Sequence, residues 1–270
     1  MATQSPPEPL NLTDLKHVPG VLGDISRERF NAYKDVDLTD LDATAPTRPS
    51  FLKALQQEGL AIIAEVKRSS PSQGSIADLD PVAAARAYEQ GGAAALSILT
   101  EPKHFGGELA HLEQVAEVVE LPLLRKDFTL HPAQLTEAKR AGASAVLLIV
   151  AVLGEQTGAY LEYARTLELD ALVEVHDERE LQTALDAGAQ IIGVNNRDLR
   201  TLEIDLRNAP SLIAKAKAQG FRGVLVAESG YRQPEELKAL KGFADAVLIG
   251  TSMAGSGDLT GALKRLRGEM

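Results

Sequence analysis

The stretch AGASAVLLIV, residues 141–150, decides the fold, because it joins a glycine-containing turn directly to an unbroken apolar run. The apolar residues do not alternate with polar ones, so both faces of the predicted strand are expected to be covered. Similar short apolar runs return along the chain, at residues 60–66, 91–99, 121–127, 170–175, 187–194, 223–229 and 243–250. The chain therefore contains eight candidate strands.

Segments with helical periodicity separate these strands. PVAAARAYEQ (81–90) begins with proline, which suits a first helical position, and DERELQTALDAG (177–188) ends on a glycine, which suits a helix C-terminus. Alternating strands and helices imply parallel strands joined by right-handed crossovers. Eight such units predict an α/β fold of the closed (β/α)8 TIM-barrel type. An open doubly wound sheet is the alternative, but the sequence lacks the GxGxxG turn after its first strand.

Residues 1–58 precede the first barrel strand and have a different character. The first 20 residues are polar and proline-rich, and we expect them to be partly disordered. DISRERFNAY (24–33) is expected to be helical, and Ser50 is a candidate N-cap for a second helix. We therefore expect an N-terminal helical extension, residues 1–58, packed on a barrel of residues 59–270 in one structural domain. Such an extension can cover one mouth of the barrel.

Composition limits the classes of function. The chain has 270 residues, of which 44% are hydrophobic and 24% charged, and it contains no cysteine. It can form a substantial core, but neither a disulfide nor a cysteine-ligated metal site. The net charge of −10 argues against nonspecific nucleic-acid binding. We see no signal peptide and no apolar run near the ~20 residues that span a bilayer, so we expect a cytoplasmic protein without a membrane partner.

Polar side chains occur where several of the predicted strands end. They are Glu65, Lys67, Lys126, Glu174, Asn195 and Arg197. The carboxyl ends of parallel barrel strands meet at one face, where the active sites of such barrels lie. Each residue has an ordinary structural explanation when taken singly, such as an ion pair for Glu65 and Lys67. Together they form a costly cluster of charges that shifts pKa values, which favours acid–base catalysis.

The histidine that follows the fifth strand, His176, is interpreted differently. Neither a second histidine nor a nearby acid shows metal-ligand spacing with it, so a loop or helix-start position is favoured over a metal ligand.

Small residues follow the last two strands. Ser229-Gly230 and Gly250-Thr251 place glycines at the two turns, where backbone N–H groups can approach an anion closely. SMAGSGD (252–258) is a candidate for a short extra helix, and barrels frequently bind phosphate in this place. Two ordinary tight turns are the alternative, but within a barrel we favour a phosphate site.

Five motifs carry a resemblance to a known family. In chain order these are AEVKRSSPS (64–72), RKDF (125–128), LVEVH (172–176), NNRDL (195–199) and ADAVLIGTS (244–252). From about residue 50 to 253 the sequence resembles the indole-3-glycerol-phosphate synthase family. The resemblance implies a TIM barrel that closes the pyrrole ring of 1-(2-carboxyphenylamino)-1-deoxyribulose 5-phosphate with loss of carbon dioxide and water. It implies no metal and no organic cofactor.

The resemblance also implies catalytic roles. Lys126 is the expected general acid that protonates the substrate carbonyl oxygen, and Glu174 the expected acid or base of the dehydration. Glu65 and Lys67 are expected to orient each other and to contact the substrate, while Asn195 holds a reacting hydroxyl. Acid catalysis by a lysine in a dry site suggests that the pKa of Lys126 is lowered.

Ser229 completes the implied catalytic set, and the remaining implied residues bind substrate. Ser229 and Arg197 lie close to the reacting hydroxyl, Ser70, Gly230, Gly250 and Thr251 hold the phosphate, and Phe105, Phe128 and Leu147 form an apolar wall beside the aromatic ring. Met253-Ala254-Gly255, within the candidate short helix, departs from the family pattern.

Three alternatives stay open at this point. Two are other phosphate-binding barrels, phosphoribosylanthranilate isomerase and the tryptophan synthase α subunit, which lack the long extension. The third is a barrel that binds a phosphorylated ligand without turnover. We expect a monomer, with a weak dimer as the alternative.

Overall fold

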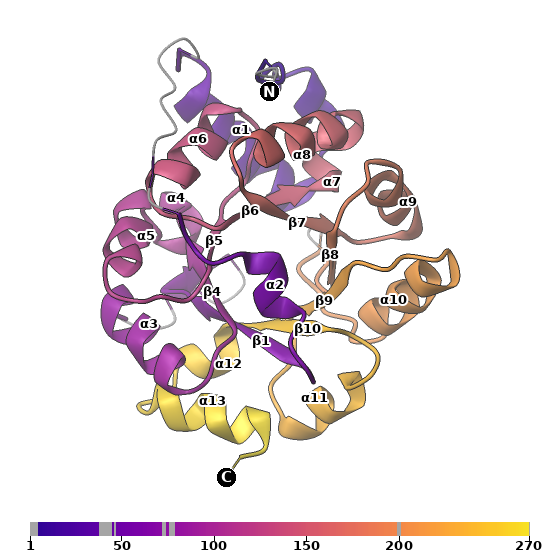
Figure 1. The fold of residues 1–270 in the computed structure, drawn as a ribbon. Coiled ribbons are helices and arrows are strands. Elements are labelled where there is room, and N and C mark those ends of the chain that lie inside the picture. Colours follow the sequence, from indigo (N-terminus) through magenta and orange to yellow (C-terminus); the bar gives the residue numbers. More distant parts are fainter. Residues whose placement is uncertain are drawn as a thin grey trace.

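The eight predicted strands form one closed barrel of parallel strands (Figure 1). The computed structural model describes residues 5–37, 45, 47–71, 74–75, 79–198 and 201–269, and of Ser70 and Ser75 only the backbone. The barrel strands are β1 (Ala61–Val66), β4 (Ala95–Leu99), β5 (Leu123–Lys126), β6 (Ala145–Ile149), β7 (Asp170–Val175), β8 (Ile191–Asn195), β9 (Val224–Glu228) and β10 (Ala246–Ile249). Each strand pairs with its neighbours along the chain, and β1 pairs with β10 to close the ring. The predicted TIM barrel is therefore confirmed.

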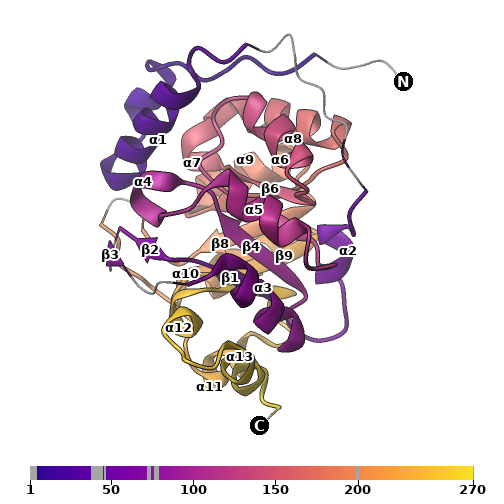
Figure 2. The ribbon, with the colours of Figure 1, turned by 90° about the vertical axis from the view of Figure 1, so that its left-hand side faces the viewer.

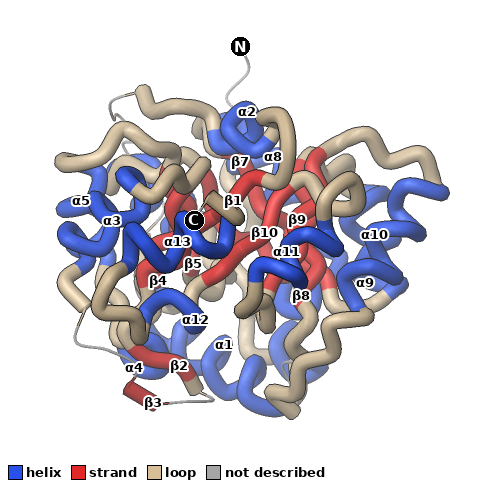
Figure 3. The backbone as a smooth tube through the Cα atoms, turned by 90° about the horizontal axis from the view of Figure 1, so that it is seen from below, coloured by secondary structure: helices blue, strands red, loops and turns tan. Residues whose placement is uncertain are grey.

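Helices surround the strands on the outside (Figure 3). The main ones are α3 (Pro81–Gln90), α5 (Leu109–Ala116), α6 (Ala133–Arg140), α8 (Thr157–Thr166), α9 (Glu178–Asp186), α10 (Asn208–Ala218), α11 (Pro234–Leu240) and α13 (Leu259–Arg267). Shorter elements are η1 (Asp14–His17), α4 (Pro102–Phe105), α7 (Val150–Leu153), η2 (Gly154–Gln156), α12 (Thr251–Ala254), and the small hairpin of β2 (Ser69–Ser70) and β3 (Gly74–Ser75). This outer layer explains the strands' unbroken apolar runs, because both faces of the sheet are buried.

Local sequence determines where the helices begin. The Asp80 carboxylate accepts hydrogen bonds from the backbone N–H groups of Val82 and Ala83, and Pro81 fills the first helical position of α3. The Asp177 side chain accepts from the N–H of Glu180 and begins α9 in the same way. Within the described part of the chain, no helix is both long and apolar enough to cross a membrane.

The N-terminal segment contacts both ends of the barrel (Figure 2). Helix α2 (Phe51–Leu55) lies at the amino ends of the strands, where Ser50 Oγ donates to Asp170 Oδ2 over 3.0 Å. Ser50 Oγ also accepts from the N–H of Lys53, which confirms the predicted N-cap. Helix α1 (Gly20–Tyr33) lies at the opposite end, over the carboxyl ends of the strands. The extension therefore covers the mouth of the barrel with one helix and its base with the other.

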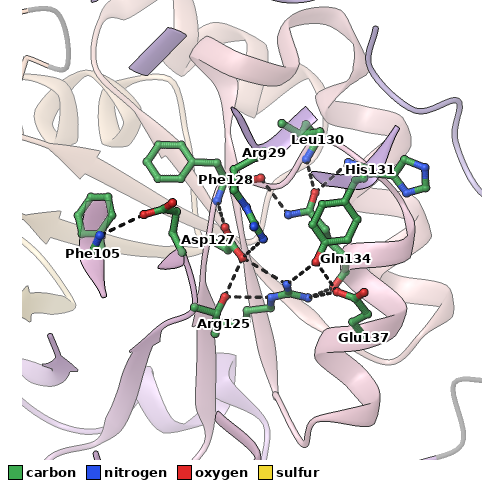
Figure 4. A network of polar contacts seen from close by, with 12 residues as sticks. Arg29, Phe105, Arg125, Asp127, Phe128, Leu130, His131, Gln134 and Glu137 are labelled. Atoms are coloured by element: carbon green, nitrogen blue, oxygen red, sulfur yellow. Dashed lines mark hydrogen bonds and ion pairs between the residues drawn. The ribbon is translucent and has the colours of Figure 1, made fainter. Parts of the chain in front are cut away.

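A buried network of charges fixes α1 to the barrel (Figure 4). Asp127, directly after β5, accepts hydrogen bonds from Arg29 of α1 at 2.8 Å, from Thr100 Oγ1 at 2.8 Å and from Arg125 at 3.2 Å. Arg125 also donates to the hydroxyl of Tyr33, at the end of α1, over 3.1 Å. Buried charges require partners of this kind. The network therefore fixes α1 against the strand that carries Lys126.

Candidate active site

A cavity opens at the carboxyl ends of the strands beneath α1, and we call it the mouth cavity. The predicted site residues that line it are Glu65, Lys67, Phe105, Lys126, Phe128, Leu147, Glu174, Asn195, Arg197, Ser229, Gly230, Gly250 and Thr251. Ser70 is the predicted residue missing from this set, because its side chain lies outside the described part of the structure. Closure of the barrel thus brings the strand ends together, although their residues lie up to 186 positions apart in the sequence, from Glu65 to Thr251.

Glu65 and Lys67 form a close ion pair at the end of β1. Their Oε1 and Nζ atoms are 2.8 Å apart, and both side chains are largely buried. Burial opposes ionisation of Glu65, but Lys67 and Lys126 outweigh it and lower the pKa of this carboxyl. Gly250 of the neighbouring loop leaves the room for this pair, because a β-carbon there would lie 2.6 Å from Glu65 Oε1.

Lys126 occupies the centre of the charge cluster. Its Nζ lies 3.7 Å from Glu174 Oε2 and 3.8 Å from Glu228 Oε2. Burial favours the neutral amine, but Glu174, Glu228 and Glu65 together raise the pKa of Lys126 above its ordinary value. The dry site alone would lower the pKa of Lys126 in the way that suits an acid catalyst, but the acidic side chains around it outweigh this effect.

The two carboxyl groups beside Lys126 differ in their surroundings. Glu174 faces His176 and Asn195 as well as Lys126, and these partners outweigh burial and lower the pKa of Glu174. Burial and the charge on Glu174 raise the pKa of Glu228. Glu228 Oε1 is buried and has no hydrogen-bond partner among the described residues. The pair can therefore provide one carboxylate and one carboxylic acid at the same pH.

The predicted site does not include Glu228. This residue ends β9, and Glu65, which was predicted, is the second-last residue of β1. Glu228 pairs in register with Asn195 of β8, so position at the strand end was sufficient to select it. Gly193 provides the space for its side chain, since a β-carbon there would clash with Glu228 Oε1.

His176 lies at the start of α9, as expected, and its ring lies between two carboxylates. Its Nε2 is 3.3 Å from Glu174 Oε1, and its Nδ1 is 2.9 Å from Glu180 Oε2. Burial disfavours the charged ring, but the two carboxylates outweigh this and raise the pKa of His176 to about 10. The i,i+4 spacing of His176 and Glu180 at the start of α9 is the sequence signal for this contact.

Asn195 and Arg197 form one side of the mouth cavity after β8. Asn195 Oδ1 accepts a hydrogen bond from the backbone N–H of Arg197 over 3.0 Å. The Arg197 guanidinium donates to the carbonyl of Leu202 over 2.9 Å, which ties together the ends of the loop. Both side chains are therefore held by the backbone around them, as a preorganised site requires.

Two glycine-containing turns, after β9 and β10, form the adjoining side of the mouth cavity. Ser229 and Gly230 have positive φ values of 64° and 97°, and positive φ is uncommon for a serine. Gly250 precedes α12, which is four residues long, and Ser252 Oγ donates to the carbonyl of Tyr231 over 3.1 Å. A short helix thus forms here as expected, but it covers Thr251–Ala254 and ends at Gly255 instead of extending to residue 258.

An apolar wall completes the cavity. The rings of Phe105 and Phe128 are tilted against each other with centroids 6.0 Å apart. Three residues that the sequence did not indicate, Val21, Leu22 and Ile25, line the cavity from α1. Their apolar spacing predicts a buried helix face, but it does not indicate which part of the barrel that face covers. Within the described residues, no group of three or more His, Asp or Glu side chains is arranged to hold a metal ion.

Comparison with known proteins gives consistent matches. The family model described as indole-3-glycerol phosphate synthase matches residues 24–266. A protein of that name from Deinococcus radiodurans is 56% identical over 270 residues, with 98% of each chain covered. Those from Mycobacteroides abscessus and Aquifex aeolicus are 48% and 46% identical, covering 86% and 81% of this chain and 86% and 85% of their own.

Solved structures show the same fold at low identity. KGPDC from Streptococcus mutans superimposes with a TM-score of 0.61 at 14% identity, over 78% of this chain and 96% of its own. A thiamine phosphate pyrophosphorylase from Pyrococcus furiosus gives a TM-score of 0.56 at 15% identity, over 77% and 94%. These likenesses concern the barrel alone. The match along the sequence is what shows that the chain belongs to the indole-3-glycerol phosphate synthase family.

Proposed function

We propose that this protein converts 1-(2-carboxyphenylamino)-1-deoxyribulose 5-phosphate to indole-3-glycerol phosphate in tryptophan biosynthesis. The observation that carries the proposal is the position of Lys126, which faces Glu174 and Glu228 inside the mouth cavity of a chain matched to this family almost end to end. The reaction forms a carbon–carbon bond, releases carbon dioxide and then loses water. It therefore needs a proton donor at one oxygen and an acid and a base for the dehydration.

Lys126 is the acid of the ring closure. As the aromatic carbon attacks the substrate carbonyl, the carbonyl oxygen becomes an alkoxide, which is more basic than a lysine amine. The carboxylates around Lys126 raise its pKa and so keep it protonated until that moment. The transfer is favourable even from this raised pKa, because the alkoxide exists only as the bond forms.

Glu65 and Lys67 hold the substrate for this step. Lys67 faces the cavity and can pair with the substrate carboxylate until carbon dioxide leaves, while Glu65 orients Lys67 over 2.8 Å. Loss of carbon dioxide then restores the aromatic ring and leaves a hydroxyl on the new five-membered ring.

The dehydration uses the unequal carboxyl pair. Glu174, ionised, removes the ring proton, and Glu228, protonated, donates to the departing hydroxyl, with Asn195 holding that hydroxyl in place. Their opposite pKa directions support this division of roles. Water leaves, and the proton gained by Glu174 returns to Glu228 through solvent before the next turnover. Lys126 takes up a proton from solvent, because the loss of carbon dioxide from a carboxylate consumes one proton overall.

The other residues of the mouth cavity position the substrate. Gly230, Gly250 and Thr251 hold the phosphate, with Ser70 from the β2 strand and Ser229 and Arg197 nearby. The aromatic ring packs against Phe105, Phe128 and Leu147. A phosphate bound away from the reacting atoms supplies positioning energy without entering the chemistry.

We propose further that the protein is a cytoplasmic monomer that binds a phosphorylated small molecule. The large hydrophobic side chains exposed among the described residues are Leu12 and Val36, too few for an extensive apolar interface. Equilibrium sedimentation checks this, and a dimer at micromolar concentration would contradict it.

An indole fluorescence time course tests the proposed function. Purified protein is mixed with the carboxyphenylamino-deoxyribulose phosphate, and the indole product is confirmed by mass. We expect stoichiometric conversion with release of carbon dioxide. Phosphoribosylanthranilate serves as the control substrate, because its turnover in place of the proposed one would assign the isomerase activity instead.

A further inference from the structure

We propose that His176 is a positioning residue that keeps Glu174 ionised and aimed into the mouth cavity, and that Glu180 holds His176 in place for this role. The inference rests on the proposed function, since it concerns the carboxylate to which we assign the base of the dehydration. It adds two residues outside the catalytic set, which reach Glu174 from the start of α9.

Three contacts fix the imidazole. Glu180 Oε2 lies 2.9 Å from His176 Nδ1 and accepts a 2.7 Å hydrogen bond from the His176 backbone N–H. The side chain of Asn208 donates to the His176 carbonyl over 3.1 Å. Backbone and ring are thus both held on the side of α9. The other ring nitrogen, Nε2, lies 3.3 Å from Glu174 Oε1, at ion-pair distance but without the geometry of a hydrogen bond.

The charges around Glu174 show why this contact matters. The carboxyl groups of Glu65 on β1 and Glu228 on β9 interact with it, and Lys126 faces it from β5. Glu180, from α9, faces the other nitrogen of His176. Lys126 is shared with Glu228, and Lys67 is paired to Glu65. His176 is therefore the cation that Glu174 does not share with another carboxyl of the mouth cavity.

The reaction itself makes the second cation necessary. In the proposed ring closure Lys126 gives its proton to the substrate oxygen and becomes neutral. At that point Glu174 loses the attraction that held it ionised. A protonated His176 remains, and the raised pKa of its ring keeps it charged at neutral pH. Glu174 is then still a carboxylate when the dehydration requires a base.

The test compares wild-type protein with His176→Gln and Glu180→Gln, and uses His111→Gln as the control. His111 lies on α5 and does not line the mouth cavity. Ring ¹⁵N NMR across pH 5 to 11 follows the protonation of His176 directly, without substrate. Steady-state kinetics across pH then give kcat and KM for each variant.

We expect His176 to stay an imidazolium above pH 8 in the wild type and to titrate at lower pH in Glu180→Gln. In His176→Gln, kcat falls by roughly 10- to 100-fold, the range seen when a partner orienting a reacting group is removed. The acid limb of the kcat profile moves to higher pH, while KM changes little. Glu180→Gln shifts the same limb by a smaller amount, and the control matches the wild type.

Two results would overturn the proposal. One is a His176 ring that titrates near the ordinary value of about 6.5 in the wild type. The other is a kcat profile of His176→Gln that overlays the wild type. If His176→Gln does not fold, the NMR titration and kinetics of Glu180→Gln decide alone, because that variant keeps the imidazole. Absence of turnover in the wild type would overturn the proposed function, whereas the NMR titration would still judge the state of His176.

Discussion

The carboxyl groups of Glu65, Glu174 and Glu228 share the mouth cavity with the ammonium groups of Lys67 and Lys126, and their neighbours determine which of them are charged. Glu65, Glu174 and Glu228 are the same chemical type at equivalent strand ends, yet the pKa is lowered for the first two and raised for the third. The difference follows from the cations that face each one. Position at a strand end indicates that a residue belongs to the site, but the distances across the barrel determine what it can do there.

The sequence could therefore predict which residues line the site better than it could predict their pKa values. Glu65, Lys67 and Lys126 were selected because alternation along a strand sends them toward the mouth. The raised pKa of Lys126 could not be predicted, because Glu174 and Glu228 come from distant parts of the chain. The partner of His176 at Glu180 was visible in the i,i+4 spacing, whereas its contact with Glu174 needed the folded geometry.

Gly250 provides a prediction at this scale. We expect Gly250→Ala to lower kcat/KM by roughly 10-fold or more, because the new methyl displaces Glu65 and its ion pair with Lys67, and small misplacements are costly in an active site. Gly255→Ala is the matched control, since nothing lies within 4 Å of its β-carbon. Steady-state kinetics compare the two variants, and equal activity would show that Glu65 tolerates displacement.

A second prediction at this scale concerns stability and pH. The pKa of His176 is raised from 6.5 to about 10, so its ion pairs stabilise the fold fully below pH 6.5. The contribution declines as the pH rises and is lost above about pH 10. Urea unfolding of wild type and His176→Gln should give a free-energy difference that shrinks over this range. A difference that grows with pH would contradict the assignment.

Helix α1 is the element whose role depends most on tertiary structure. Residues 24–33 were predicted to be helical and lie within α1, which begins at Gly20. The sequence predicted that the extension can cover one mouth of the barrel, and the folded chain places α1 over the mouth cavity. We propose that the extension and the barrel form one structural domain, because Asp127 and Arg125 connect them through buried charges.

Removing the charge on Arg29 tests this connection. Arg29→Ala leaves Asp127 buried with one partner fewer, so we expect the free energy of unfolding to fall by about 1–3 kcal/mol. Because α1 lines the mouth cavity, KM should rise more than kcat falls. Arg27→Ala is the control, since Arg27 lies on the exposed surface of the same helix and pairs there with Asp24. Chemical unfolding with substrate kinetics distinguishes the outcomes, and an unchanged KM would make α1 a purely structural element.

At the scale of the whole molecule, the barrel follows from a simple periodic signal. Eight apolar runs separated by helical segments specify a closed parallel sheet, since each strand is buried on both faces. The two ends of the barrel could not be assigned to α1 and α2 in this way. Contacts such as Ser50 with Asp170 join residues 120 positions apart, which no local pattern encodes.

The absence of a cofactor is a prediction for the whole molecule. The cations of the mouth cavity are side chains, and the described residues offer no metal-binding group. We therefore expect millimolar EDTA to leave kcat and KM unchanged after prolonged dialysis. Loss of activity that a divalent cation restores would contradict a reaction carried by side chains alone.

Lys126→Met gives the most direct test of the central claim that the charge cluster at the barrel mouth performs the chemistry. Indole fluorescence is followed for this variant, for the wild type and for Lys139→Met, whose lysine pairs with Glu168 away from the mouth cavity. We expect Lys126→Met to lose roughly 10²- to 10⁴-fold in kcat, as when a general acid is removed, with an unchanged circular dichroism spectrum. Lys139→Met should match the wild type. Turnover by Lys126→Met within a few-fold of the wild type would contradict the account.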